Sequence, residues 1–285
     1  MIKEVSIVIH PEKEKDEKFI QKEICLALKK QGISFEEKDI STVFVKKSID
    51  ARHKNIKLFL RYKVYIGEKP ADENSLPEWK TTTGKKTVAI IGSGPAGLFG
   101  ALKLLEHGIK PVVIERGSET SKRKRDIAMI STTGIVDENS NYCFGEGGAG
   151  TFSDGKLYTR SNKRGNINGI LKIFTHFGAD KKILTDSHPH IGTDKLPAIV
   201  NNIRNFILQQ GGEFLFDTEC VDFILEKSED EKIVKGVVVK SHGEIKNIFA
   251  DAVLLATGHS ADSIYTLLAK LSPESLEAKT FAMGV

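Results

Sequence analysis

The sequence contains little cysteine, and none of its cysteines form a close pair. Cys25, Cys143 and Cys220 lie far apart, and no C-x-x-C spacing occurs. Their separation excludes a dithiol redox pair or a zinc knuckle built from neighbouring cysteines. We therefore expect no metal site, and we interpret Cys143 as a buried structural residue.

The sequence also lacks a long hydrophobic run. No stretch approaches the roughly 18 apolar residues that a membrane-spanning helix needs. The N-terminus opens with a short alternating run instead of the apolar core of a signal peptide. Hydrophobic residues make up 40% of the chain and charged residues 28%, which is typical of an ordinary globular protein. We expect a cytoplasmic protein without a membrane span.

The chain also has little excess of one charge over the other. The 42 basic residues exceed the 38 acidic residues only slightly, and the net charge of +4 does not by itself indicate nucleic acid binding. The strongest basic cluster, Lys122–Arg125, has two interpretations, a solvated face or a contact to phosphate.

Residues 1–67 have the pattern of a small α+β domain. Apolar residues alternate from Val5 to Ile9, as they do in a half-buried strand. An amphipathic helix follows, and two further strands are expected at 43–49 and 56–66. Residues 68–86 contain prolines and threonines with almost no apolar periodicity, which predicts a linker that Trp79 pins to a domain surface.

The next segment carries three parts that belong together in dinucleotide-binding proteins. Thr87–Ile91 is a short apolar run typical of a buried parallel strand. The glycine run GSGPAG follows at 92–97 and opens a helix, and a second strand ends at Glu115. A strand, a glycine turn at a helix start and an acidic residue about 20 positions further on form the dinucleotide fingerprint.

Each part of this fingerprint has a physical reason. Gly92 permits the tight turn, a side chain at Gly94 would strike the pyrophosphate, and Gly97 lets the helix pack close to the sheet. The helix start offers N–H groups and a positive dipole end to the diphosphate. The Glu115 carboxylate can accept hydrogen bonds from ribose hydroxyls and would repel a 2′-phosphate, which argues against NADP at this site. The alternative is a glycine-rich turn in an ordinary α/β domain.

The motifs resemble a known superfamily. Pro95-Ala96 within GSGPAG and Glu115-Arg116-Gly117 are similar to FAD-binding members of the glutathione-reductase-like flavoproteins, which have two dinucleotide-binding domains. The stretch 251–258, which ends in ATG, and a β-meander expected at about 220–250 match in the same order. The resemblance implies an α/β fold: a Rossmann-like FAD-binding domain with a parallel sheet and a β-meander, preceded by the small βαββ domain.

A second glycine run, GEGGAGTFSDGKL at 145–157, resembles the superfamily segment that lies along the extended FAD. Its backbone N–H groups can line the pyrophosphate and the electron-rich edge of the flavin. Together with ATGHSADS at 256–263 and the segment 48–52, it is similar to an uncharacterised family of FAD-dependent dehydrogenases. The implied organisation is a FAD-binding domain in two parts, 87–155 and 194–262, around a substrate or cap segment at 156–193, followed by the start of a C-terminal region at 263–285.

The fingerprint and the resemblance together predict a set of FAD contacts. For Arg123, the alternative is a side chain that is simply exposed to solvent. The prediction for Val221 rests only on its position at a strand start, where superfamily members place backbone contacts to adenine. The predicted residues are Gly92, Ser93, Gly94, Pro95, Ala96, Gly97, Glu115, Arg116, Arg123, Gly147, Gly148, Ala149, Gly150, Thr151, Val221, Ala256, Thr257 and Gly258.

No catalytic acid or base stands out, and flavin chemistry often needs none, because hydride arrives at the flavin and the protein supplies orientation and electrostatics. His259 is the first candidate, followed by His190 and Lys156, and a structural role is the alternative for each. Ser153, Asp154 and Lys156 can instead organise the loop that covers the flavin.

The sequence therefore predicts an FAD-dependent oxidoreductase of unknown substrate, with NADH or NADPH as a transient electron donor. The alternatives are a flavin hydroxylase or a reductase of unsaturated lipids and, from another class, a binding protein whose basic N-terminal domain contacts RNA or a protein partner. Superfamily members carry another flavin contact near their C-terminus, and nothing after Gly258 supplies one. Residues 281–285 read as the opening of a strand, so we expect a truncated, inactive fragment. The oligomeric state is not indicated.

Overall fold

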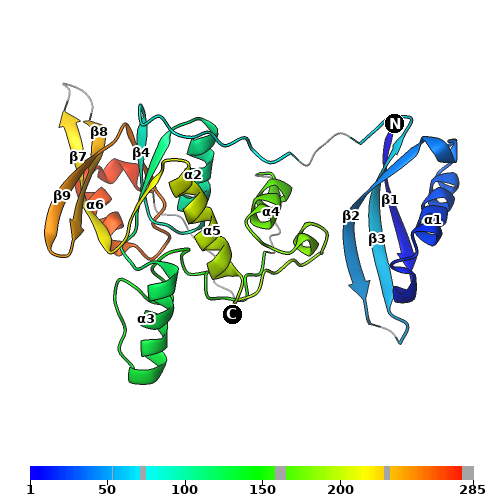
Figure 1. Ribbon diagram of the computed structural model, residues 1–285, viewed down its shortest axis with the longest axis horizontal. Helices are drawn as coiled ribbons and strands as arrows, with labels where there is room; N and C mark the ends of the chain where they lie inside the picture. The colour runs from blue at the N-terminus through cyan, green and yellow to red at the C-terminus, as the bar shows by residue number, and fades with distance from the viewer. Residues whose placement is uncertain (53, 71–74, 158–164, 228–231, 278–285) are drawn as a thin grey trace. The chain divides into compact units, whose positions relative to one another are not determined.

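The computed structural model describes residues 1–52, 54–70, 75–157, 165–227 and 232–277 (Figure 1). The chain forms two compact units. The N-terminal unit comprises Met1–Leu76 and Lys156–Gly192, and the α/β unit comprises Pro77–Gly155 and Thr193–Val285.

The N-terminal unit contains a three-stranded antiparallel sheet in the order β1-β3-β2 with one long helix. This arrangement confirms the predicted βαββ domain. Its elements are β1 (Ile2–Ile9), α1 (Glu17–Lys30), β2 (Ile40–Asp50) and β3 (Lys57–Ile66).

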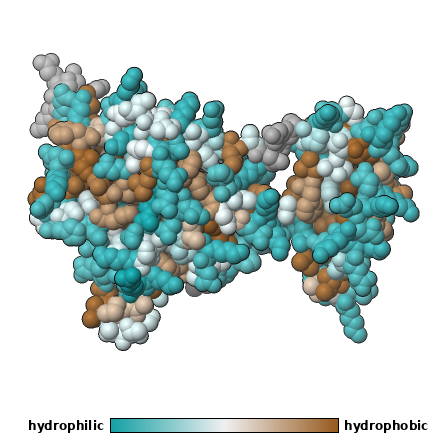
Figure 2. Space-filling view, in the orientation of Figure 1, coloured by the Kyte–Doolittle hydropathy of each residue, from teal (hydrophilic) through white to brown (hydrophobic). Residues whose placement is uncertain are grey.

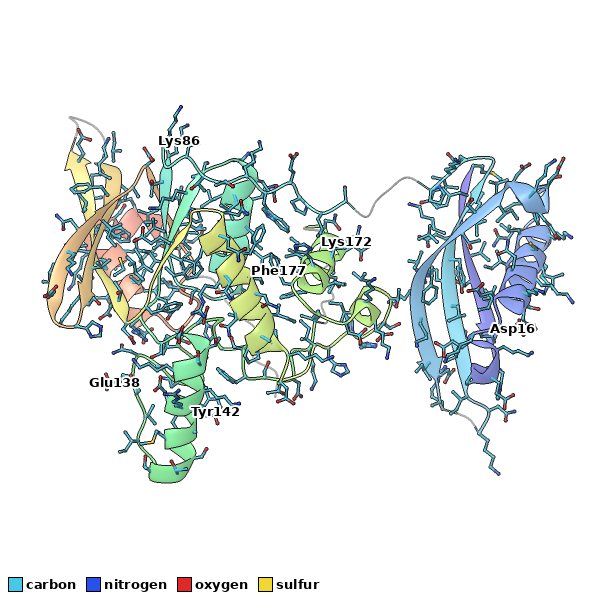
Figure 3. The ribbon with its side chains drawn as sticks, in the orientation of Figure 1. Asp16, Lys86, Glu138, Tyr142, Lys172 and Phe177 are labelled. Carbon is cyan, nitrogen blue, oxygen red and sulfur yellow. The ribbon has the colours of Figure 1, made fainter. Side chains whose placement is uncertain are left out.

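Helix α1 forms because its apolar residues recur every three or four positions. Ile20, Ile24 and Leu28 are buried against the sheet. Asp16, labelled at the start of α1 in Figure 3, accepts a hydrogen bond from the Phe19 N–H at 3.0 Å. This side chain satisfies one of the N–H groups that a helix start leaves without a partner.

Residues 156–192 belong to the N-terminal unit and contain a helix that the sequence pattern does not reveal. This helix is α4 (Ile167–His176), and a 3-10 turn (Lys181–Leu184) follows. The Lys47 N–H on β2 donates to the Thr185 carbonyl at 2.8 Å, and the Ser187 hydroxyl donates to the Lys47 carbonyl at 2.6 Å. The segment thus extends the edge of the sheet at β2.

The α/β unit is built on a parallel sheet in the order β10-β4-β5-β6. The predicted β-meander, β7-β8-β9, is also present. The strands are β4 (Thr87–Ile91), β5 (Lys110–Ile114), β6 (Glu213–Leu215), β7 (Thr218–Lys227), β8 (Lys232–Ser241), β9 (Glu244–Phe249) and β10 (Ala252–Leu255). The helices are α2 (Pro95–Glu106), α3 (Thr120–Thr133), α5 (Leu196–Gln209) and α6 (Asp262–Leu271).

Two layers cover this sheet. Helices α2 and α5 pack on one face. On the other face, apolar side chains of β4 and β5 form one core with residues of the meander and α6, as Figure 1 lets the reader follow. Strand order reverses between β4 and β10, and ligands of open α/β sheets bind in the crevice at such a point. The predicted Rossmann-like architecture is therefore confirmed.

Trp79 meets the expectation for the linker. Trp79 stacks edge-on against Phe206 of α5 at 5.1 Å between ring centroids, so it pins the linker as expected. Helix α5 begins without a side-chain cap. Its first helical residue is Leu196, and its N-cap residue is Lys195, which makes no side-chain capping bond.

Polar side chains dominate the visible surface, and hydrophobic atoms gather at the far end of α3 (Figure 2). Met129, Ile135 and Val136 are exposed there. Among the described residues, no helix is both long and apolar enough to cross a membrane.

Replacing Leu28 by Ala should destabilise the N-terminal unit by about 2 to 5 kcal/mol, because Leu28 is fully buried and truncation leaves a cavity. Leu26 lies on the same helix and is 41% exposed, so Leu26→Ala is the matched control and should change stability by about 0.5 kcal/mol or less. Native-state hydrogen exchange of the β1 and β3 amides measures both. Equal effects of the two substitutions would contradict the packing described here.

Candidate functional site

A cavity of about 250 Å³ opens at the carboxyl ends of β4, β5 and β10. Each of these strands ends in a predicted motif: the GSGPAG turn after β4, Glu115 after β5 and ATG after β10. Because the carboxyl ends of parallel strands meet at one edge of a sheet, three segments distant in the sequence converge here. The predicted residues that line the cavity are Gly92, Gly94, Pro95, Ala96, Glu115, Arg116, Gly148, Ala149, Ala256, Thr257, Gly258 and His259.

The first glycine turn leaves no space for side chains at two of its positions. Gly92 has φ of +104°, and a Cβ there would lie 2.4 Å from the Ala256 carbonyl oxygen. A Cβ at Gly97 would lie 2.0 Å from the Gly92 carbonyl oxygen. Gly94 differs, because the nearest atom to a Cβ there is the Gly148 Cα, at 3.8 Å. A side chain at Gly94 would therefore enter the cavity without striking the protein.

Helix α2 begins at this turn with an uncapped N-terminus. Gly94 is its N-cap residue, and no side chain bonds to the first-turn N–H groups. Gly94, Pro95 and Ala96 all line the cavity. A helix start of this kind combines unpaired N–H groups with the positive end of the helix dipole, and it favours an anion such as a diphosphate.

The second glycine run lies directly against the first. The Gly147 N–H donates to the Ser93 carbonyl at 2.9 Å. A Cβ at Gly148 would lie 3.2 Å from the Gly94 Cα, which is closer than most side chains tolerate. Main chain from two runs about fifty residues apart thus forms one wall of the cavity.

Glu115 is held in place by the glycine turn. Its Oε2 accepts hydrogen bonds from the Ser93 N–H at 2.9 Å and the Ser93 hydroxyl at 2.8 Å, and its Oε1 accepts from the Gly117 N–H at 2.8 Å. The side chain is 6% exposed. A carboxylate has about four acceptor sites, so three protein donors leave room for a ligand hydroxyl on the cavity side.

Arg123 corrects the expectation of a direct phosphate contact. It is fully buried, does not line the cavity, and donates five hydrogen bonds to backbone carbonyls of residues 141–148. It is not an exposed residue either. Burial lowers the pKa of Arg123 to about 10, while the nearby Glu115 and Glu146 raise it, so the side chain remains charged at neutral pH.

Glu146, the acid within GEGG, is a residue that the sequence analysis missed. It is fully buried. Its Oε2 accepts a hydrogen bond from the Thr120 N–H in the first turn of α3 at 2.7 Å, and its Oε1 lies 3.4 Å from the Arg204 Nε. Burial raises the pKa of this carboxyl above its ordinary value, although Thr120 and Arg204 oppose the shift. An acidic residue between glycines was the available signal.

Six other predicted contacts do not line the cavity. Ser93 holds Glu115, and the Thr151 hydroxyl donates to the Glu146 carbonyl at 3.2 Å. Val221 sits where the pairing of β7 with β8 shifts its register. The six are Ser93, Gly97, Gly147, Gly150, Thr151 and Val221.

The three catalytic candidates do not all belong to the same unit. His259 lines the cavity. Lys156 and His190 belong to the N-terminal unit, where they face each other in an isolated antiparallel bridge. Within the described residues, no group of three or more His, Cys, Asp or Glu side chains is placed to hold a metal ion.

Several cavity residues were not predicted. One of them, Phe144, lies under the predicted Arg116, whose guanidinium carbon is 4.0 Å from the centroid of the ring. Cys143 corrects the expectation of a buried residue, because it is exposed and lines the cavity. Burial raises the pKa of Cys220 to about 12, so that thiol stays protonated. The unpredicted lining residues include Cys143, Phe144, Gly145, Thr218, Glu219, Cys220, Ser260 and Ser263.

These features fit the adenosine diphosphate part of FAD. The cavity has an uncapped helix start for the diphosphate, an oriented carboxylate for the ribose, and bare backbone where a Cβ would fill the space. Residues 85–135 match the family model described as an FAD binding domain. Residues 1–65 match a domain of unknown function, DUF8436.

Comparisons with whole proteins give partial matches. An uncharacterized protein of Clostridium beijerinckii is 37% identical over 283 residues, which is 93% of this chain and 50% of the relative. The Arabidopsis thaliana flavin-containing monooxygenase FMO GS-OX-like 9 is 24% identical over 194 residues, covering 61% of this chain and 37% of the relative. The chain thus spans about half the length, or less, of these relatives. The crystal structure of Thermovibrio ammonificans THI4 matches with a TM-score of 0.42 and 18% identity over 66% of this chain and 63% of that chain.

Glu146 and Glu119 should have opposite effects on the pH dependence of stability. Because the pKa of Glu146 is raised in the folded protein, its stabilising contribution is present below the unfolded value of 4.5 and is lost as the pH rises through the raised pKa. A hydrogen bond from Arg204 lowers the pKa of Glu119, so its contribution is present above 4.5 and is lost as the pH falls.

Denaturant unfolding of the unsubstituted protein, Glu146→Gln and Glu119→Gln between about pH 4 and pH 8 measures this difference. As the pH rises, the stability of the unsubstituted protein should fall relative to Glu146→Gln and rise relative to Glu119→Gln. Slopes of the same sign for the two variants would show that the burial argument for Glu146 is wrong.

Proposed function

We propose that this protein is an FAD-dependent oxidoreductase that passes hydride or electrons through the flavin. The observation that carries the proposal is the meeting of Gly94 and Gly148 at the uncapped start of α2, beside the carboxylate of Glu115. The match of residues 85–135 to the FAD binding domain supports the same function. The flavin would supply the redox chemistry when FAD is bound.

Each part of the cavity has a proposed role toward FAD. Glu115 would accept a hydrogen bond from a ribose hydroxyl, and the start of α2 would hold the diphosphate. Arg116 and Phe144 form a flat apolar and cationic surface beside Glu115, suited to the adenosine. The ATG turn after β10 and His259 line the other side of the cavity, and His259 is the proposed residue for holding a proton near the substrate.

Glu115 also bears on which nucleotide stays bound and which acts only as an electron donor. The buried negative charge of Glu115 would repel a 2′-phosphate, so the resident nucleotide is FAD and not NADP. NADH or NADPH would then act as a transient donor that reduces the flavin. The proposed substrate is a small molecule.

A flavin-dependent monooxygenase is the second candidate, and the relationship to the Arabidopsis monooxygenase favours it. The two candidates differ in their use of oxygen. A dehydrogenase passes electrons to its acceptor without needing oxygen, whereas a monooxygenase consumes oxygen as it oxidises NADPH or NADH.

Replacing Gly94 by Asp should abolish tight FAD binding without destabilising the fold. The N-cap backbone (φ −70°, ψ −175°) suits Asp, whose carboxylate would cap the free N–H groups of α2 and place a negative charge where the diphosphate binds. We expect FAD affinity to fall by about a hundredfold or more, because charge-assisted hydrogen bonds are lost and repulsion is added. Fluorescence titration with FAD measures the affinity, and denaturant unfolding measures the stability.

Gly150→Asp is the matched control for this substitution. Gly150 lies in the second glycine run, but it does not line the cavity, and a Cβ there meets no atom within 4 Å. The same change of charge should therefore leave FAD affinity within about twofold of the unsubstituted protein. Undiminished FAD binding by Gly94→Asp would rule out the proposed site.

With FAD bound, NADH or NADPH should bleach the visible absorbance of the flavin under anaerobic conditions. Admitting air then separates the candidates, because a dehydrogenase should consume oxygen only slowly in the absence of its acceptor. Rapid oxygen consumption coupled to an oxygenated product would favour the monooxygenase. Failure of every reductant to bleach the bound flavin would argue against an oxidoreductase of either kind.

A further inference from the structure

A single buried cation organises the second glycine run. Arg123 comes from α3, and its five hydrogen bonds all end on carbonyl oxygens of residues 141–148, a stretch in which Figure 3 labels Tyr142 beside α3. The acceptors are Asn141 at 3.0 Å, Tyr142 at 3.2 Å, Gly145 at 3.2 Å, Glu146 at 2.6 Å and Gly148 at 2.8 Å. The guanidinium also lies over the Phe152 ring, 5.3 Å from its centroid.

These bonds decide which way the peptide groups of the loop point. The carbonyls of Gly145, Glu146 and Gly148 all face the guanidinium, on the side away from solvent. The peptide N–H group that follows Gly148 belongs to Ala149, which lines the cavity and donates to no acceptor among the described residues. The loop therefore turns its carbonyl oxygens to Arg123 and leaves an N–H group for a ligand.

Glu146 fixes the same loop from a second direction. Its carboxylate bonds to the first turn of α3 through the Thr120 N–H and pairs with Arg204 of α5. Its own N–H donates to the Ser118 carbonyl at 3.0 Å. Together with the bond from Gly147 to Ser93, these contacts join the glycine run to α3, α5 and the first glycine turn.

We infer that Arg123 is a positioning residue for FAD: without reaching the cofactor, it holds the carbonyl oxygens of Gly145, Glu146 and Gly148 away from the cavity and so leaves the Ala149 N–H on the cavity side. A carbonyl turned toward the cavity would meet a diphosphate with its negative end and leave a buried acceptor unpaired. The positive charge of Arg123, directly behind the peptide layer, adds to the attraction for an anion. This inference rests on the FAD binding proposed above. It attributes part of the affinity for FAD to a residue outside the cavity.

Shape, and not charge alone, is what the geometry requires of Arg123. A planar guanidinium presents its N–H donors in a fixed fork, and here Nε and Nη2 donate to one carbonyl each while Nη1 donates to three, so that one side chain serves five acceptors spread over eight residues. A lysine keeps the charge but offers one compact ammonium group, which can satisfy only part of this set. Arg123→Lys therefore separates the two contributions.

The experiment compares Arg123→Lys with Arg125→Lys, its matched control. Arg125 lies on the same helix and is exposed. For each protein, hydrogen exchange of residues 141–151 reports the order of the loop, and fluorescence titration reports the affinity for FAD. We expect Arg123→Lys to exchange faster in this loop alone and to lose FAD affinity by about tenfold to a hundredfold, as the loss of charge-assisted bonds predicts. Arg125→Lys should match the unsubstituted protein in both.

The two readouts separate failure of this inference from failure of the proposed function. Faster exchange in the loop with unchanged FAD affinity would overturn the positioning role. Loss of protection throughout the α/β unit would overturn it too, since Arg123 would then serve the fold as a whole. If the unsubstituted protein binds no FAD, the proposed function fails, and with it this role for Arg123, whereas the exchange result still tests whether Arg123 orders the loop.

Discussion

The close approach of two stretches of main chain, at Gly94 and Gly148, is the constraint on which the site depends. A Cβ at Gly148 would lie 3.2 Å from the Gly94 Cα, so a side chain there would force the runs apart. The contact brings the uncapped start of α2 and the Ala149 N–H to one wall of the cavity. Both kinds of donor are fixed by the backbone, and a fixed array of donors loses little entropy when an anion binds.

The parallel sheet makes this approach possible. Strands β4 and β10 are neighbours, and the connections that leave their carboxyl ends diverge, so a crevice opens between them. Gly92 and Gly97 let α2 start close to that edge, where a Cβ at either position would strike a backbone oxygen. The buried core between the sheet, the meander and α6 holds the edge rigid. The position of the cavity thus follows from the strand order. The glycines keep one of its walls free of side chains.

How far a sequence predicts such a site depends on how local each interaction is. The turn at residues 92–97 and Glu115 were predictable because strand, turn, helix and acid follow one another in a short stretch. Arg123 was not, since its role depends on carbonyls about 20 residues further on, and a basic run such as Lys122–Arg125 has the same appearance whether a member is buried or exposed. Helix α4 was missed because residues 156–192 carry few clear repeats and are stabilised by contacts with β2. His190 and Lys156 were proposed as catalytic candidates for the same reason. Nothing in the order of residues along the chain indicates that they belong to the N-terminal unit.

The charges around the cavity have an order that would suit a nucleotide in one orientation. At one end, Glu115 presents acceptors, which suit the hydroxyl donors of a ribose. Next to it, the start of α2 and the Ala149 N–H present donors, which suit the acceptor oxygens of a diphosphate. Reversing the ligand would place phosphate oxygens against the carboxylate and leave buried donors unpaired, and each mismatch costs more in a water-poor cavity than at the surface. The buried guanidinium behind the loop strengthens the donor end of this array, so the polarity is built into the fold before any ligand arrives.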